Sequence, residues 1–160
     1  MARILTLTLA LLLATTELIL TDAEAFDYDW QQSTLWGEVD GETYVSTWYD
    51  STTKTAYSYH WYYVENNQIA KVKAYPVSEA TFTWPGDFAE AIPPSISLFV
   101  LGNSSQSYDH THSHWMGDKE KGGGSVSASS NMRGRHTAKE GIDAVKWWSG
   151  AACSTNFEIK

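Results

Sequence analysis

The sequence predicts an all-β protein, an antiparallel β-sandwich of about six to eight strands with one short helix near the C-terminus. Polar and apolar residues alternate with a period of two over most of the chain, as in strands that bury one face. Aromatic residues, which strands favour, are abundant, with 8 Trp, 9 Tyr and 5 Phe among 160 residues. Short turn signals rich in Gly, Asn and Pro separate the alternating segments.

Residues 1–25 have the features of a secretory signal peptide. A positive start precedes an apolar run at residues 4–14, and small residues precede a cleavage site after Ala25. No run of membrane-spanning length follows in residues 26–160. We therefore expect a secreted, extracellular protein with a single domain over residues 26–160 and no membrane span.

A first hairpin is predicted from residues 35–39 and 42–49. Both segments alternate, and Asp40-Gly41 stands between them. Asp-Gly is typical of the two-residue turn that joins antiparallel strands, because both of its positions tolerate a positive φ. We expect these two segments to pair with each other.

A second hairpin is predicted from residues 57–64 and 69–77, which flank an Asn-Asn turn signal. In the first of these segments every second position is aromatic, and the residues are Tyr57, Tyr59, Trp61 and Tyr63. An extended backbone places all of them on one face of the strand. Residues 81–84 alternate again and end at a Pro-Gly turn, and the apolar run at residues 95–101 is typical of a central strand.

Residues 104–135 are predicted as a mobile polar loop, because Ser, His, Gly and Asn dominate there. Such a long loop is uncommon in a compact domain, so a strand at residues 125–129 is the alternative. A short helix is expected next, since Thr137 and Glu140 have the spacing of a capping box and Gly150 stands where a helix would end. Its apolar face would consist of Ala138, Ile142, Val145 and Trp148.

The chain is acidic, with 11 Lys and Arg against 19 Asp and Glu and a formal net charge of -8. This charge repels phosphate backbones and anionic headgroups, so nucleic acid is not an expected partner. Hydrophobic residues at 42% and charged residues at 19% fit a globular domain rather than a disordered polyelectrolyte.

The histidines His110, His112 and His114 occupy alternate positions of one segment. On an extended strand they share a face at about 6.6 Å per step, so two neighbours can converge on one ion and the third cannot unless the backbone bends. Further ligands could come from His136, His60, Asp109, Asp118 or Glu120. Neutral imidazole favours zinc, copper or nickel. The alternative is a solvated polar loop whose histidines only titrate.

The aromatic residues exceed what a core of this size is expected to hide. Core packing and cross-strand pairs account for most of them. In a polar loop, Tyr108 and Trp115 are the expected exposed pair, followed by the adjacent Trp147 and Trp148. Flat C–H faces of sugars pack on such rings, so we predict that these four residues bind a ligand.

Cys153 has no partner within the chain, because it is the only cysteine. Its neighbours include no Lys, Arg or His that would favour a thiolate, so a buried, inert thiol is the preferred interpretation. A disulfide to another molecule is the alternative. Asn103 begins an Asn-Ser-Ser sequence and is an acceptor for N-glycosylation if the chain is eukaryotic.

These patterns favour a non-enzymatic recognition module that binds carbohydrate or another extracellular surface through exposed aromatic residues. A metal-binding protein or metal-dependent hydrolase built on the histidine run is the first alternative. A structural or assembly subunit of an envelope or matrix, polymerising through Cys153 and exposed strand edges, is the second.

Overall fold

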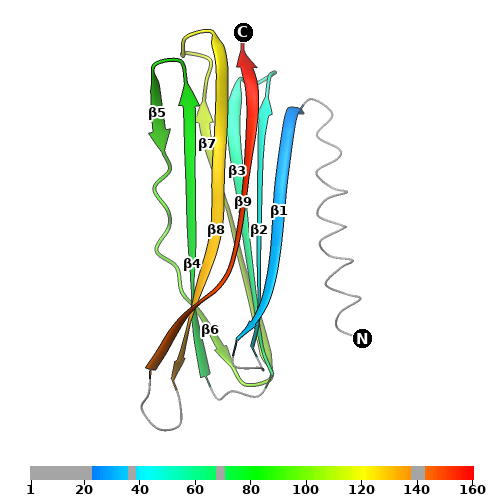
Figure 1. The fold of residues 1–160 in the computed structure, drawn as a ribbon, viewed down its shortest axis with the longest axis vertical. Coiled ribbons are helices and arrows are strands. Elements are labelled where there is room, and N and C mark those ends of the chain that lie inside the picture. Colours follow the sequence, from blue (N-terminus) through cyan, green and yellow to red (C-terminus); the bar gives the residue numbers. More distant parts are fainter. Residues whose placement is uncertain (1–22, 36–38, 68–70, 138–142) are drawn as a thin grey trace.

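A computed structural model describes residues 23–35, 39–67, 71–137 and 143–160, which fold almost entirely into antiparallel strands (Figure 1). The strands are β1 (Ala23–Leu35), β2 (Val39–Asp50), β3 (Thr55–Asn66), β4 (Lys71–Trp84), β5 (Asp87–Glu90), β6 (Leu98–Leu101), β7 (Ser104–Trp115), β8 (Gly122–Thr137) and β9 (Asp143–Ile159). The predicted all-β class is confirmed, with nine strands in the described ranges rather than six to eight. The apolar run predicted as part of a signal peptide lies outside these ranges.

The strands form two sheets that pack face to face. The first sheet has the order β1-β2-β3-β7, and the second has the order β5-β4-β8-β9, with β6 also paired to β4. The chain therefore changes sheet after β3, returns at β7 and leaves again at β8. This is the predicted antiparallel β-sandwich, elongated along its strands (Figure 1).

Both predicted hairpins are wrong, because neither turn signal joins the two strands that flank it in one hairpin. Leu35 pairs with Val39, so β1 and β2 form the first hairpin, and Asp40 and Gly41 lie inside β2. β3 does not pair with β4: it pairs with β2 and β7, and the Asn66 signal marks the crossover to the opposite sheet. A turn dipeptide is therefore compatible with a position inside a strand, and it does not say which strand its neighbour will join.

The predicted mobile loop at residues 104–135 is also wrong, since β7 and β8 occupy most of it. The alternative of a strand at residues 125–129 is correct. Serine and histidine occupy many positions on both faces of these strands, so their composition resembles that of a loop. The burial of successive residues nevertheless alternates regularly, as in any strand that covers one face.

The predicted helix near the C-terminus is wrong over the residues that the structure describes there. β8 continues to Thr137, and β9 pairs with it from Asp143 to Ile159. The remaining part of the prediction, residues 138–142, lies outside the description. Pairing along β8 satisfies the backbone groups that a short helix containing Gly141 would have satisfied internally. Among the described residues no helix is long and apolar enough to cross a membrane.

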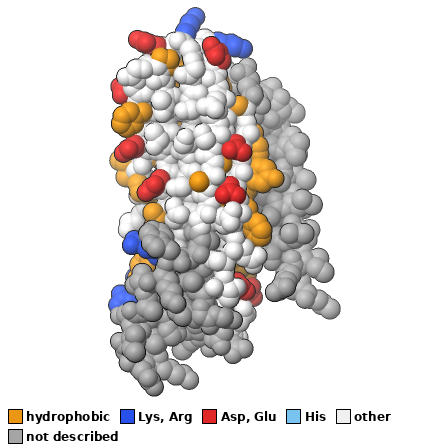
Figure 2. Space-filling view, in the orientation of Figure 1, with side chains coloured by type: hydrophobic (Ala, Val, Ile, Leu, Met, Phe, Trp, Pro, Cys, Tyr) orange, Lys and Arg blue, Asp and Glu red, His pale blue; other side chains and the backbone are white. Residues whose placement is uncertain are grey.

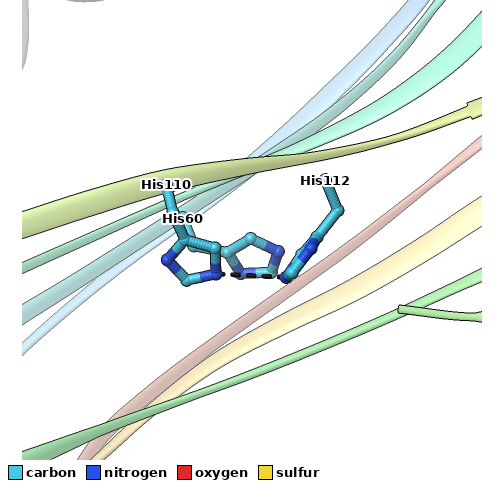
Figure 3. A group of neighbouring side chains, drawn as sticks. All are labelled: His60, His110 and His112. Atoms are coloured by element: carbon cyan, nitrogen blue, oxygen red, sulfur yellow. Dashed lines mark hydrogen bonds between the residues drawn. The ribbon is translucent and has the colours of Figure 1, made fainter. Parts of the chain in front are cut away.

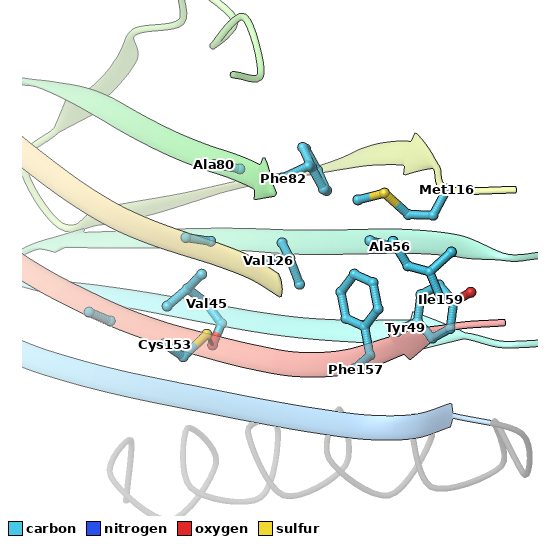
Figure 4. Packing of buried hydrophobic residues seen from close by; sticks show 12 residues of the cluster. Val45, Tyr49, Ala56, Ala80, Phe82, Met116, Val126, Cys153, Phe157 and Ile159 are labelled. Carbon is cyan, nitrogen blue, oxygen red and sulfur yellow. Dashed lines mark hydrogen bonds between the residues drawn. The ribbon is translucent and has the colours of Figure 1, made fainter. Parts of the chain in front are cut away.

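The described residues form two hydrophobic clusters in the interior. The larger cluster includes Val45, Tyr49, Phe82, Val126 and Phe157 (Figure 4). Its rings pack closely, since Tyr49 and Phe157 stack with centroids 4.2 Å apart. The second cluster, around Tyr62, Val64, Val72, Val100 and Met132, lies further along the same strands. Buried polar residues lie between the two clusters, among them Thr43, Ser58, His60, Ser78 and Ser130.

One pair of sheet edges is joined by side chains. Asp27 and Asp29 of β1 accept hydrogen bonds from the backbone N–H groups of Ser154 and Ala152 of β9, each at 3.1 Å. β9 is the end strand of its sheet and β1 is the end strand of the other. The carboxylates therefore satisfy donors on an edge that would otherwise be open to another chain.

Candidate functional site

Three histidines from two neighbouring strands converge inside the sandwich. His60 lies on β3, and His110 and His112 lie on β7. In the antiparallel register His60 is opposite His110, while His112 is opposite Ser58, two positions along. One ring nitrogen from each histidine lies within 4.8 Å of the other two. Figure 3 shows the three rings together, with His60 beside His110 and a hydrogen bond of 3.1 Å joining the Nε2 atoms of His110 and His112, whose rings are nearly perpendicular.

Serine hydroxyls surround this histidine cluster. Nδ1 of His60 lies 2.8 Å from Oγ of Ser130, and its Nε2 lies 3.0 Å from Oγ of Ser58. Nε2 of His110 lies 2.7 Å from Oγ of Ser78. Ser78 and Ser130 belong to β4 and β8, so these hydrogen bonds connect the two sheets. They form the polar layer that separates the two hydrophobic clusters.

Burial keeps the cluster uncharged. Burial, with smaller contributions from the neighbouring His110 and His112, lowers the pKa of His60 to about 3. Burial, with a smaller contribution from His112, lowers the pKa of His110 to about 4, and burial also lowers the pKa of His112. The rings are therefore neutral near pH 7, and the neutral imidazole is the form that binds a metal ion.

His114 lies apart from the cluster, although it shares a strand face with His110 and His112. Its ring stacks on Trp84 with centroids 5.2 Å apart and lies 5.6 Å from the ring of Phe82. Of the further ligands considered from the sequence, only His60 joins the cluster among the described side chains. The side chain of His136 is outside the description.

A second candidate site covers the outer face of the first sheet. We call it the aromatic face, and it consists of Phe26, Tyr28 and Trp30 on β1, Tyr44 and Trp48 on β2, and Tyr57, Tyr59, Trp61 and Tyr63 on β3. The residues that alternate with them in β2 and β3 are buried inside the sandwich. The strand register brings these rings side by side. Trp30, Tyr44 and Trp61, for example, lie opposite one another across three strands.

The rings of the aromatic face pack on one another. Trp48 and Tyr57 stack with centroids 5.0 Å apart, and Tyr28 and Tyr44 stack at 6.1 Å. Neighbouring rings half cover those on β2 and β3, while β1 stays open: Tyr28 is 60% exposed and Phe26 is 47% exposed. The face thus offers a broad layer of rings rather than isolated ones.

Polar groups border the aromatic face. The fourth strand of the first sheet is β7, and on the same outer side it carries Ser107, Asp109, Thr111 and Ser113. Within the face, Glu42 is only 3% exposed. Burial raises the pKa of this carboxyl, a hydrogen bond from the side chain of Trp30 partly opposes that rise, and neighbouring carboxylates add to it.

The opposite outer face has a different chemistry. Figure 2 looks onto this side, over β4, β8 and β9, where hydrophobic side chains gather mainly at the margins. Exposed positions there include Ser127, Ser154 and Asn156. The aromatic side chains are therefore concentrated on one side of the molecule.

The four aromatic residues predicted to bind a ligand have different environments. Trp115 is 56% exposed and lies opposite Thr55, at the β7 end of the aromatic face. Tyr108 points inward, where it stacks on Tyr62 and His110. It was predicted to be exposed because its segment was interpreted as a loop. Trp147 and Trp148 lie in β9, and their side chains are outside the description.

The signal for the aromatic face is present in the sequence. Alternation places the aromatic residues at positions 57–63 on one side of a strand, but it does not assign that side to the exterior. The opposite side, with Ser58, His60 and Tyr62, is fully buried. Composition favours the reverse assignment, and only the stacking of the second sheet decides between them.

Cys153 and Asn103 lie as the preferred interpretations require. The thiol of Cys153 is buried at 9% exposure, near the hydroxyl of Thr47 and the carbonyl of Val45. Burial raises its pKa to about 11, a hydrogen bond with Thr47 opposes the rise, and Asp27 and Asp29 add to it. Asn103 is exposed at the turn between β6 and β7.

Comparisons with known proteins add no functional information. The sequence matches no protein-family model and no curated protein. Similar solved structures include the putative ApaA protein from Bordetella pertussis, with 7% identity, a TM-score of 0.35 and coverage of 81% of this chain and 90% of that one. A protein from Archaeoglobus fulgidus shows 7% identity and a TM-score of 0.30, with coverage of 84% and 96%.

Proposed function

We propose that this protein is a secreted, non-enzymatic recognition module that binds carbohydrate through the aromatic face. The observation that carries the proposal is the concentration of nine aromatic side chains on the outer side of β1, β2 and β3. A layer of this kind is energetically unfavourable in water unless a ligand covers it.

The chemistry of the face fits a sugar polymer. Pyranose rings present flat C–H surfaces to aromatic rings and direct hydroxyls outward around their edges. The rings on β1, with Tyr28 and Phe26 foremost, would receive the flat surfaces. Hydroxyl and carboxyl groups on β7, such as Asp109 and Thr111, would bind the sugar hydroxyls.

The shape of the face favours an extended chain over a single small sugar. Ligands of drug size usually bind in concave pockets that cover most of their surface. The aromatic face is instead the outside of a sheet, where successive rings recur at about 6.6 Å along β1 and β3, and neighbouring strands lie about 4.8 Å apart. A polysaccharide that contacts several rings at once would gain affinity from each of them.

The test is a glycan-binding assay with matched variants. Insoluble and soluble polysaccharides would be incubated with the wild-type protein and with Tyr28→Ala, Trp30→Ala and Trp115→Ala, and the bound fraction would be measured. Phe88→Ala is the control, since Phe88 is 58% exposed on β5 of the other sheet. Each lost ring should weaken binding by about 1 kcal/mol or more, or roughly fivefold to tenfold.

The pattern among variants decides the outcome. Weaker binding of Tyr28→Ala and Trp30→Ala, with Phe88→Ala unchanged, supports the proposal. Equal binding by all of these variants would contradict it. So would a wild-type protein that binds no member of a broad panel of polysaccharides. Loss of binding in His112→Ala with full binding in Trp115→Ala would transfer the ligand site to the histidine cluster.

A further inference from the structure

We propose that the histidine cluster of His60, His110 and His112 binds one divalent transition-metal ion of the zinc type inside the sandwich. This site is separate from the aromatic face, because its side chains point to the opposite side of the same sheet. The inference therefore does not depend on the proposed recognition of carbohydrate.

The distances suit such an ion. Zinc–nitrogen bonds of about 2.0–2.1 Å in a tetrahedron place two ligand nitrogens about 3.3 Å apart. The Nε2 atoms of His110 and His112 are already 3.1 Å apart. All three ring nitrogens lie within 4.8 Å of one another, so the widest pair needs to approach by at most about 1.5 Å.

The strands supply the convergence without a special loop. A cross-strand pair brings His60 beside His110, and the diagonal position brings His112 to the same point. The rings of His110 and His112 meet at 77° with centroids 4.7 Å apart, so their nitrogens approach edge to edge. β3 and β7 are long, at 12 residues each, and they pair along their whole length, with β3 inside the sheet and β7 at its edge, which gives the ligands a regular support.

The surroundings are those of a ligand site rather than of a core. The histidine cluster lies between the two hydrophobic clusters, at positions where valine or leucine would pack without the free-energy cost of burying polar groups. Oγ of Ser130 lies 2.8 Å from Nδ1 of His60, so when Nε2 of that ring binds the ion, the protonated Nδ1 can donate to this hydroxyl, which would orient the ring as outer-shell partners of metal ligands do.

The ligand set defines the class of ion. Three imidazoles with no carboxylate in the cluster favour zinc, copper, nickel or cobalt over calcium or magnesium. On binding, the hydrogen bond between His110 and His112 is replaced, and the ring that donates it adopts the tautomer with its proton on Nδ1. A water molecule or small anion would complete the tetrahedron, since the described side chains provide three ligands.

The experiment is a metal titration of the whole purified protein after treatment with EDTA. Zinc binding would be followed by calorimetry and by competition with a chromophoric chelator, and cobalt would be added as a spectroscopic probe of geometry. We expect one equivalent of zinc per chain and the intense visible absorption of tetrahedral cobalt. His112→Gln, at a partly exposed position, should reduce the affinity more than about 100-fold.

His114→Gln is the matched control, because His114 lies on the same strand and face but outside the cluster. Its affinity for zinc should remain within about twofold of the wild type. Circular dichroism would verify that both variants fold. Long-range proton–nitrogen NMR of the imidazole rings would give a direct second readout, with zinc shifting the ring nitrogens of His60, His110 and His112 only.

Three outcomes would overturn the inference: no stoichiometric binding by the wild type, equal loss of affinity in His112→Gln and His114→Gln, or NMR shifts confined to other histidines. Failure here leaves the carbohydrate proposal intact, since that proposal is tested with variants of the opposite face. Conversely, glycan binding by the wild type with no metal present would not bear on this site.

Discussion

At the scale of single residues, the environment of a side chain decides chemistry that its identity leaves open. His60, His110 and His114 have the same side chain. The first two meet inside the sandwich among serine hydroxyls, and the third stacks on Trp84. Tyr108 was expected to be exposed, and its inward position follows from the same alternation that turns the histidines inward. The residue types were visible in the sequence, and their partners were not.

Cys153 allows a prediction at this scale. The folded protein should react with a thiol reagent such as dithionitrobenzoate at least about 100-fold more slowly than the same protein in denaturant, because burial disfavours the thiolate. The reaction would be followed by absorbance with and without urea. Cys153→Ser should show no reaction in either condition. A covalent dimer that forms rapidly in air from the folded wild type would contradict this prediction.

At the scale of elements, strands that look irregular in composition are held by their neighbours. β8 and β9 contain Gly122–Gly124 and a serine-rich stretch, yet they pair continuously apart from one shift of register between Met132 and Arg133. The outer edge of β9 is fastened to β1 through Asp27 and Asp29. These carboxylates hold together the first and last strands of the chain.

Removing the two carboxylates that join β1 to β9 should cause a measurable loss of stability. Asp27→Ala combined with Asp29→Ala should lower the free energy of unfolding by about 2 kcal/mol, at about 1 kcal/mol for each lost hydrogen bond. Urea denaturation followed by tryptophan fluorescence would measure it. Asp87→Ala is the control, since Asp87 accepts a hydrogen bond only from its neighbour Phe88 in the described part of the chain. An equal effect of Asp87→Ala and the double variant would show that the edge contacts contribute little.

At the scale of the whole molecule, the sandwich has two unlike outer faces and a polar layer in its middle. One face is aromatic, the other is rich in hydroxyl groups, and histidines and serines separate the two hydrophobic clusters inside. The proposed carbohydrate site therefore lies on the aromatic face, and the proposed metal site lies in the interior layer. This arrangement also makes the stability of the molecule depend on the protonation of its centre.

The metal-free protein should therefore lose stability in acid. The pKa of His60 in the folded state is about 3 and that of His110 about 4, both below the ordinary 6.5. Below about pH 6.5 the unfolded chain binds more protons than the folded one, so the stability present at pH 7 decreases as the pH falls. Each extra proton taken up on unfolding contributes about 1.4 kcal/mol per pH unit.

Urea denaturation in EDTA between about pH 7 and about pH 5 would measure this slope, because ordinary carboxylates titrate mostly below that window. His110→Gln should flatten the slope, since it removes one titrating group and keeps a side chain that can bond to Ser78. A stability that is constant over this window in the wild type would refute the prediction. A slope that is unchanged in His110→Gln would assign the effect to other groups.

The antiparallel sandwich could be predicted from the order of residues alone, because a period of two, many aromatic residues and frequent turn signals are local properties. The same alternation shows which residues share a strand face, as with Tyr57, Tyr59, Trp61 and Tyr63. The folded arrangement was needed to show which face is inside, which strands are neighbours and which histidines meet. Those outcomes depend on the stacking of two sheets and on strand order, and contacts between residues as distant as His60 and Ser130 leave no periodic trace in the chain.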